Sequence, residues 1–285
     1  MTNPRQEIKQ LISKNAALPD LPQLLTELSL LEAQTHSSTA DMARIISSDQ
    51  ALAAKVLRLV NSPFYGFSRE ITSIGNALIL LGIHVIKSLI LSSSIFELLQ
   101  KTAPGLWRHS LATAVTANII TRQLQLDDSE ETTTAALLHD IGKIVIIVYL
   151  MDDYENILAR SNQMDISSTN IERSLIWTDH AEIGQWLTKK WLLSEKLQEP
   201  IACHHDIAQS SQYRIATAVV HYANTLATAR GLGFNGNKQV TAICPLARKT
   251  LKITHTQMAN IIEELENQLD KINNFSLVSE EEDVQ

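Results

Sequence analysis

The residues best suited to chemistry in this chain of 285 residues are an adjacent imidazole and carboxylate, His139 and Asp140, at the end of an apolar run. Neighbours on a helix project about 100° apart, so the two groups can address two sides of one metal site when other helices supply the remaining ligands. Gly142 permits another segment to approach closely, and Lys143 returns to the Asp140 side one turn later, where a cation can meet a phosphate. The His-Asp dipeptide alone is weak evidence, because such pairs also arise by chance.

Further side chains that can ligate a metal gather in the second half of the chain. Histidine with carboxylate favours zinc, iron or manganese over calcium, and a carboxylate among histidines can bridge two ions. Each histidine alone is more often a core or capping residue, but their joint order favours a site built from several helices. The metal-capable residues of this interval are His109, His139, Asp140, His180, His204, His205, Asp206 and His221.

Composition indicates an ordinary soluble protein, with 45% hydrophobic residues and a net charge of −7. The basic residues form no long run, which argues against a nucleic-acid surface. Cys203 and Cys244 are the only cysteines, too few for a disulfide framework. The start of the chain lacks the apolar core of a signal peptide, and the longest apolar run, residues 144–151, is too short for a membrane span. We therefore expect a cytoplasmic protein without a membrane association.

Apolar spacing of helical period runs through most of the chain, and strand-like alternation is nearly absent. The fold class is therefore predicted to be all-α, in two helical parts. The pair of helices within residues 71–99 superficially suggests a helix-turn-helix, but residues 83–90 are too apolar to face a DNA groove. Helices are predicted at two places within residues 5–31, at 41–46, 50–60, 71–81, 83–99, 107–124, 132–150, two within 167–192, and at 195–205, 214–230 and 257–272.

The clearest internal boundary is the segment 101–105, which carries Pro104 and Gly105 between two helical patterns. We expect four parts. They are an N-terminal helical part (1–100), a helical part with the metal site (101–232), a C-terminal helical extension (233–275) and a disordered acidic tail (276–285).

The order His, His-Asp, His, His-His resembles that of the HD phosphohydrolase superfamily, whose members hold one or two metals with these residues and a final Asp. Motifs in the first half narrow the resemblance to the HDOD family, regulatory relatives of the HD and HD-GYP proteins. The resemblance extends from about residue 18 to residue 231. Its motifs are the segments 48–52, 58–66, 71–82, 106–110, 137–143, 179–184 and 204–205.

This resemblance implies roles for individual residues. Asp140 would bridge two ions, and Lys143 would lie near a substrate phosphate. Asn224 stands where active relatives have an aspartate, and a neutral ligand weakens a second metal. The Gly-Tyr-Pro motif of cyclic-di-GMP phosphodiesterases is missing after Asp206, and Glu172 matches a common acid of the family. The implied metal ligands are His109, His139, Asp140, His180, His204, His205 and Asn224.

The first functional hypothesis is a bacterial signal-transduction protein that keeps a divalent metal site and acts mainly through contacts with partner proteins. The alternative is a metal-dependent phosphohydrolase acting on a nucleotide or other phosphate ester. In that case a metal-bound hydroxide would be the nucleophile, with Asp140 and Lys143 as the catalytic residues. A third hypothesis is a structural homodimer without metal, and the sequence leaves enzymatic activity open.

Overall fold

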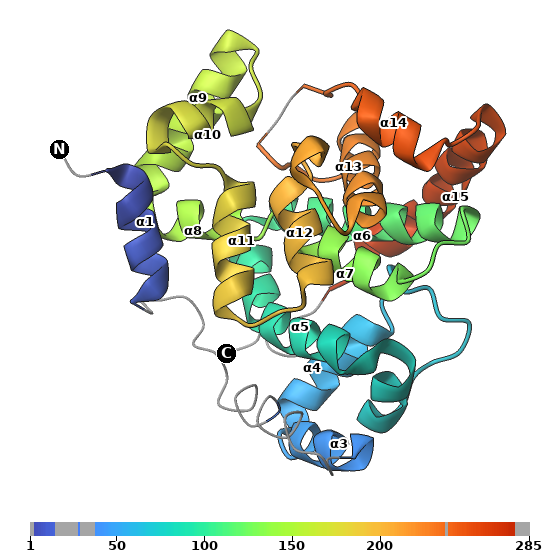
Figure 1. The fold of residues 1–285 in the computed structure, drawn as a ribbon. Helices are drawn as coiled ribbons and strands as arrows, with labels where there is room; N and C mark the ends of the chain where they lie inside the picture. The colour runs from blue at the N-terminus through green and yellow to red at the C-terminus, as the bar shows by residue number, and fades with distance from the viewer. Residues whose placement is uncertain (1–2, 15–27, 29–37, 237–238, 277–285) are drawn as a thin grey trace.

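The computed structural model describes residues 3–14, 28, 38–236 and 239–276, and this part of the chain is helical without strands (Figure 1). The predicted all-α class is confirmed. The second helix predicted within residues 5–31 and residues 277–285 of the predicted tail lie outside the described residues. The α-helices are α1 (Pro4–Ser13), α3 (Thr39–Ser47), α4 (Gln50–Val60), α5 (Ile74–Thr102), α6 (Pro104–Gln123), α7 (Ser129–Leu138), α8 (Gly142–Tyr149), α9 (Met151–Met164), α10 (Ser168–Ile176), α11 (His180–Lys190), α12 (Glu195–Cys203), α13 (Arg214–Ala229), α14 (Pro245–Leu251) and α15 (His255–Asn274).

Local sequence explains why the N-terminal helices begin where they do. The Ser38 and Asp41 side chains form a capping box at α3, and Asp49 and Ser73 cap α4 and α5. The predicted interruption at Gly82 is present, because this residue takes a φ of 76° that few other residues tolerate. These helices form the lower part of the molecule in Figure 1.

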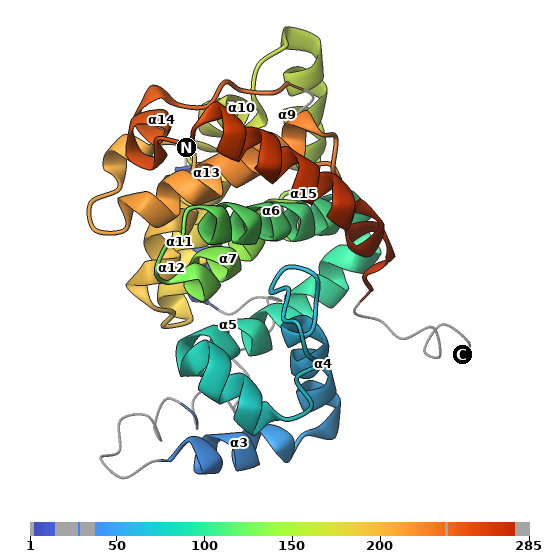
Figure 2. The same ribbon diagram turned by 90° about the vertical axis from the view of Figure 1, so that its right-hand side faces the viewer.

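Helix α6 lies at the centre of the second part and is buried along almost its whole length. It packs against α7, α13 and α15, and Figure 2 shows α15 lying across it. Small side chains on α6, such as Ala112, Ala114 and Ala117, permit this close helix packing. The helix is therefore a rigid support for His109 near its start.

The loop between α4 and α5 contacts the second part through buried side chains. The Tyr65 hydroxyl lies 2.8 Å from Oγ1 of Thr134 on α7, and both side chains are buried. Asn61 holds the loop in shape, since its side chain accepts from the Ile71 amide at 2.7 Å and donates to the Ile71 carbonyl at 2.8 Å. The loop thus contacts the helix that ends at His139.

The structure corrects the sequence prediction for one helix, which is divided in two, and adds two helices. The helix predicted over residues 132–150 is divided into α7 and α8 by a turn at residues 139–141, where the Ile141 amide donates to the Leu138 carbonyl three residues back. Helices α9 and α14 were not predicted. Helix α9 buries few side chains, mainly Ile157 and Ser161, so its apolar pattern is weak.

Among the described residues, two helical segments are long and apolar enough to cross a membrane, Ile74–Thr102 and Ser129–Tyr149. Within them, 61% and 89% of the most apolar window is buried inside the fold. Core helices of a folded domain have the same composition, so these segments are weak evidence for a membrane protein.

Candidate metal centre

The ends and turns of five helices bring the predicted ligands together. Asp140 belongs to both of two overlapping clusters, in each of which the potential ligand atoms lie within 4.8 Å of one another. One cluster holds His109 and His139, and the other holds His180, His204 and His205. The elements that supply them are α6 for His109, the α7–α8 turn for His139 and Asp140, the first residue of α11 for His180, and the segment after α12 for His204 and His205.

The two carboxylate oxygens of Asp140 face different histidines. Oδ2 lies 3.3 Å from Nε2 of His139 and 3.9 Å from Nε2 of His109. Oδ1 lies 3.1 Å from Nε2 of His180 and 4.0 Å from Nε2 of His204. A carboxylate placed in this way can bridge two neighbouring cations. The geometry therefore agrees with the bridging role that the resemblance implies.

The imidazole rings are oriented by hydrogen bonds on the side away from the centre. Nδ1 of His139 donates to the Ala136 carbonyl, and Nδ1 of His204 donates to the Ile201 carbonyl, both at 2.8 Å. Nδ1 of His180 lies 2.7 Å from the Glu172 carboxylate. A ring that donates from Nδ1 presents the lone pair of Nε2, which is the arrangement found in most histidines that ligate metals.

Several buried atoms at the centre lack the partners that buried polar groups normally have. Nε2 of His139 and Nε2 of His204 make no hydrogen bond within the described part of the chain, and Oδ1 of Asp140 has only its ion-pair contact with Nε2 of His180 at 3.1 Å. Leaving a buried polar atom unpaired is costly, so such atoms need an explanation. A divalent cation between nitrogen and oxygen donors satisfies all three, and the residues present therefore fit a transition metal.

Two glycines allow the backbone segments to meet at the centre. A Cβ on Gly142 would lie 2.0 Å from the His180 carbonyl oxygen, so only glycine lets α8 approach α11 so closely. The predicted close approach at Gly142 is confirmed. Gly233 has a φ of 72°, and a Cβ there would lie 2.3 Å from the His109 amide nitrogen. These contacts fix the positions of two ligand-bearing segments through the main chain.

The loop after α13 closes the centre and supplies a residue that the sequence did not indicate, Asn235. Its Nδ2 lies 3.2 Å from Nε2 of His109, and its carbonyl accepts from Lys143 at 2.7 Å. The Lys143 ammonium also donates to Oδ2 of Asp140 at 2.7 Å and is buried. The only signal for this loop is its glycine content between residues 231 and 236, which is typical of tight backbone packing.

Asn224, for which the resemblance implies a neutral metal ligand, lies beside His109. Its Oδ1 lies 3.0 Å from Nε2 of His109 and accepts a weaker bond from Asn235 at 3.4 Å. His221, one turn earlier on α13, lies outside the two clusters. Its ring donates to the His204 carbonyl and accepts from the Cys244 amide, so it holds two segments together. Asp206 caps the short 3-10 helix that follows and is also outside the clusters.

Burial and neighbouring charges shift the pKa values of these groups in different directions. Burial lowers the pKa of His109 to about 3 and holds the pKa of His204 and His205 well below the ordinary value. Burial opposes charge on His180 as well, but the Glu172 carboxylate outweighs it and raises the pKa to about 9. Burial would raise the pKa of Asp140, yet His139 and Lys143 hold it well below its usual range. The centre therefore offers an ionised carboxylate among mostly neutral imidazoles.

The family model of the HDOD domain matches residues 18–207, two thirds of the chain. The chain belongs to the HDOD family. A solved HDOD domain protein of unknown function from Geobacter sulfurreducens is 26% identical, with a TM-score of 0.72, and the match covers 96% of this chain and 99% of that one.

Three further proteins are similar to this HDOD protein. An uncharacterised protein of Treponema pallidum (strain Nichols) is 25% identical over 73% of this chain, which spans 41% of that protein's length. A candidate phosphohydrolase from Shewanella amazonensis SB2B has the same fold, with 23% identity, a TM-score of 0.61 and coverage of 90% and 97%. A candidate signal transduction protein from Marinobacter aquaeolei VT8 shares the fold at 19% identity and a TM-score of 0.70, with coverage of 95% and 64%.

Proposed function

We propose that this HDOD protein is a regulatory protein that binds one or two divalent transition-metal ions and acts mainly through contacts with partner proteins. The observation that carries the proposal is the set of buried donor atoms, His139 Nε2, Asp140 Oδ1 and His204 Nε2, that have no hydrogen-bond partner within the described residues. The ligands would be His109, His139, Asp140, His180, His204 and His205, with the amide of Asn224 as a weaker, neutral ligand beside His109. A bound ion would supply Lewis acidity at the centre.

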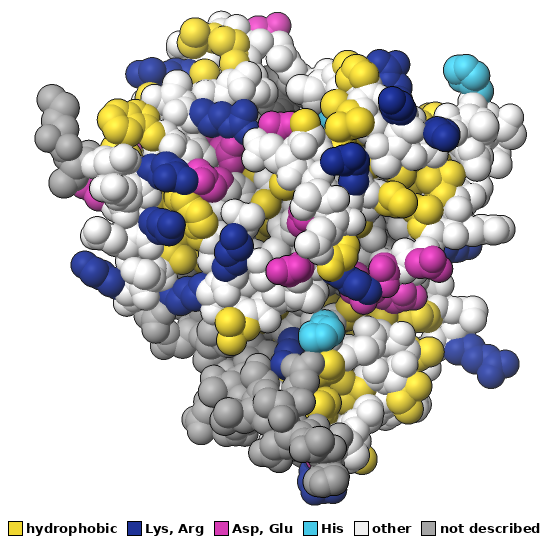
Figure 3. All heavy atoms as spheres, viewed as in Figure 1, with side chains coloured by type: hydrophobic (Ala, Val, Ile, Leu, Met, Phe, Trp, Pro, Cys, Tyr) yellow, Lys and Arg dark blue, Asp and Glu magenta, His cyan; other side chains and the backbone are white. Residues whose placement is uncertain are grey.

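A basic surface over α1 and α11 supports the regulatory part of the proposal. Figure 3 shows Lys and Arg side chains gathered there, on the left of the view. A cavity of about 580 Å³ there is lined by Arg5, Lys9, Lys189 and Lys190 around Trp186, and also by Glu182, which forms an ion pair with Arg5. Such a surface in a chain of net charge −7 suits an acidic partner. Because α11 begins with His180, a partner on this helix would contact an element that carries one of the proposed metal ligands.

Elemental analysis of the purified protein tests the metal site. We expect about one or two equivalents of iron, manganese or zinc in the wild type, and a loss of most metal in His139→Ala and Asp140→Ala. The exposed His255 on α15 gives a control, since His255→Ala should keep its metal. Folding of each variant is checked by circular dichroism. Well-folded wild-type protein without metal, produced with all three metals supplied, would falsify the proposal.

Charge reversal tests the interaction surface. We expect Lys9→Glu with Lys189→Glu to reduce the recovery of partner proteins in pull-downs, because both side chains are exposed at the basic surface. Lys101→Glu with Lys249→Glu changes the net charge equally at exposed positions elsewhere. Equal loss with both pairs would mean that net charge, and not this surface, governs the interaction.

A second candidate function is metal-dependent hydrolysis of a phosphate ester, which a polar cavity of about 230 Å³ next to His205 favours. In this case Asp140 would hold the metal, and Lys143 would neutralise charge near it. Turnover of generic phosphate monoesters and diesters by the metal-loaded wild type, abolished in Asp140→Ala, would support hydrolysis.

The third candidate is a structural homodimer without metal. Elemental analysis that finds no metal, together with a dimer mass measured in solution, would distinguish it from the other two.

The cytoplasm remains the expected compartment. Both cysteines of the chain, Cys203 and Cys244, are free thiols. Free thiols persist most readily in a reducing compartment.

A further inference from the structure

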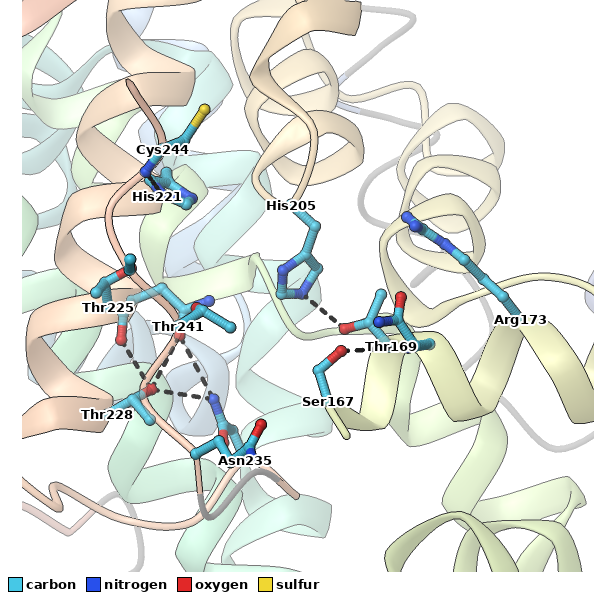
Figure 4. Close-up of a pocket in the computed structure, with 14 residues that line it drawn as sticks. Ser167, Thr169, Arg173, His205, His221, Thr225, Thr228, Asn235, Thr241 and Cys244 are labelled. Atoms are coloured by element: carbon cyan, nitrogen blue, oxygen red, sulfur yellow. Dashed lines mark hydrogen bonds between the residues drawn. The ribbon is translucent and has the colours of Figure 1, made fainter. Parts of the chain in front are cut away.

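A polar cavity adjoins the metal centre on the side of His205 and has a volume of about 230 Å³ (Figure 4). Side chains of α10 face those of α13 across it, with His205 between them. His205 also belongs to the cluster that contains Oδ1 of Asp140 and Nε2 of His204, neither of which makes a hydrogen bond within the described residues. The cavity therefore reaches a residue of the metal centre directly.

The lining of this cavity favours an anion. Arg173 is the only lining residue with a permanently charged side chain, and no carboxylate lines the cavity among the described residues. Nε of Arg173 donates to the Asp179 carboxylate at 2.6 Å, which leaves the Nη groups of the guanidinium to meet an anion. The other polar groups are hydroxyls and amides, all of which can donate hydrogen bonds. Thr169 provides one of these hydroxyls, 3.3 Å from Nε2 of His205, and this residue is buried.

A neighbouring cavity provides a contrast. It has a volume of about 400 Å³ and shares Arg173 and His205 with the first. Its lining also includes the carboxylates of Asp179, Glu182 and Asp206, which would repel an anion. Of these two spaces at His205, the polar cavity between α10 and α13 is therefore the better place for a phosphate.

The rest of the lining disfavours a nucleobase. No Phe, Tyr or Trp side chain lines the cavity within the described residues, so a base would find only the small imidazoles of His205 and His221 to stack on. The volume is also below the usual range for sites of drug-sized ligands, roughly 300–1,000 Å³. The α13 wall instead presents the hydroxyls of Thr225 and Thr228 and the amide of Asn224, which suit the hydroxyl groups of a small ligand.

We propose that this cavity binds a small phosphate monoester of a hydroxylated, non-nucleotide alcohol. The phosphate would lie near His205, Thr169 and Arg173, and the hydroxyl groups would contact the α13 wall. This inference rests on the proposed metal centre, because the phosphate would lie beside it. It applies to a ligand that the protein senses and to a substrate that it hydrolyses.

Binding measurements on the full chain test the proposal. Isothermal titration calorimetry would compare glycerol 3-phosphate and ribose 5-phosphate with glycerol, ribose, AMP and cyclic di-GMP, using metal-loaded protein. We expect the two phosphate monoesters to bind at least about tenfold more tightly than the unphosphorylated alcohols, the gain from hydrogen bonds to a charged group. They should also bind more tightly than AMP and cyclic di-GMP, because the cavity is small for a ligand that carries a base. Nucleotides that bind as tightly or more tightly would overturn the proposal, as would an absence of binding by both sugar phosphates.

Variants locate the binding in this cavity. Thr225→Val keeps the side-chain shape and removes one hydroxyl, and Arg173→Gln removes the positive charge. Each should weaken ribose 5-phosphate binding about tenfold. Thr102→Val and Arg44→Gln make the same changes at exposed positions of the N-terminal part and should have no effect. Equal affinities of cavity variants and controls would overturn the assignment to this cavity.

Metal content measured on the same samples separates this inference from the proposed function. Protein that contains stoichiometric metal but binds no phosphate monoester contradicts the ligand alone. Folded protein that acquires no metal contradicts the metal centre itself.

Discussion

The side-chain oxygen of Asn224 lies 3.0 Å from Nε2 of His109, on the same side as the Asp140 carboxylate. This is the position at which the resemblance to HD phosphohydrolases implies an aspartate. The amide oxygen can ligate a cation but carries no negative charge. Since Asp140 already faces Lys143 at 2.7 Å, the part of the centre around His109 holds little net negative charge to attract an ion.

Replacing this amide with a carboxylate should strengthen metal binding. We expect Asn224→Asp to raise the affinity for zinc or manganese by about tenfold, because it adds a charged ligand beside His109. Competition against a fluorescent chelator measures this change. An unchanged or lower affinity would show that the amide is not a ligand.

The Glu172 carboxylate should influence metal binding through His180. It accepts from both Nδ1 and the backbone amide of His180, at 2.7 and 2.8 Å, and so fixes the ring. Glu172→Gln should lower the metal affinity by roughly 10–100-fold, as loss of such partners usually does. Glu155→Gln on the exposed face of α9 is the matched control. The same affinity in both variants would exclude an orienting role.

The contact between α8 and α11 should be intolerant of any side chain. In Gly142→Ala, the new methyl group would lie 2.0 Å from the His180 carbonyl oxygen, so the helices must separate. We expect a loss of about 3 kcal/mol in the free energy of unfolding, measured by denaturant titration. Gly75→Ala provides the control, because it meets nothing within 4 Å and lies in a helix. That change should be neutral or stabilising.

The carboxylate of Glu199 should make stability depend on pH. Partial burial opposes its ionisation, but hydrogen bonds from Ser210 and the amides of Tyr213 and Gln212 outweigh this and lower its pKa. A lowered pKa stabilises the fold above the ordinary value of 4.5, and this stabilisation is lost as the pH falls through the lowered value. Glu199→Gln should therefore cost about 1 kcal/mol at neutral pH, a modest value because solvent screens the group.

Urea denaturation over a range of pH checks this prediction. The difference between wild type and Glu199→Gln should shrink below the ordinary pKa and approach zero in strong acid. A difference that stays constant down to about pH 3 would assign the effect to shape and not to charge.

The sequence indicated which candidate ligands lie close together better than it indicated the backbone that positions them. His139, His180 and His204 lie next to apolar helical runs, so their burial near helix ends follows from local pattern. The turn at residues 139–141 does not follow from it, because its neighbours continue the same apolar run. It accompanies the close approach of Gly142 to His180, a contact between segments 38 residues apart (180 − 142).

The role of Asn235 was not predictable for a related reason. Asparagine is common in glycine-rich loops, so its presence in the sequence indicates no special role. The packing of Gly233 against His109 brings Asn235 to the candidate metal centre. Helix α14 was missed because it is short and buries only Ala247 and Leu251. Local periodicity thus indicates which residues are buried, whereas contacts between distant segments decide which polar groups meet.

The segment that closes the metal centre lies beyond residue 207, where the match to the family model ends. Asn224 and Asn235 are both in this segment, as is the α13 wall of the polar cavity. Ligand selectivity can therefore diverge without any change in the part of the chain that defines membership of the family. Two HDOD proteins with equally good family matches could bind different small molecules, and their specificities are better compared across the loop and helix that follow the domain.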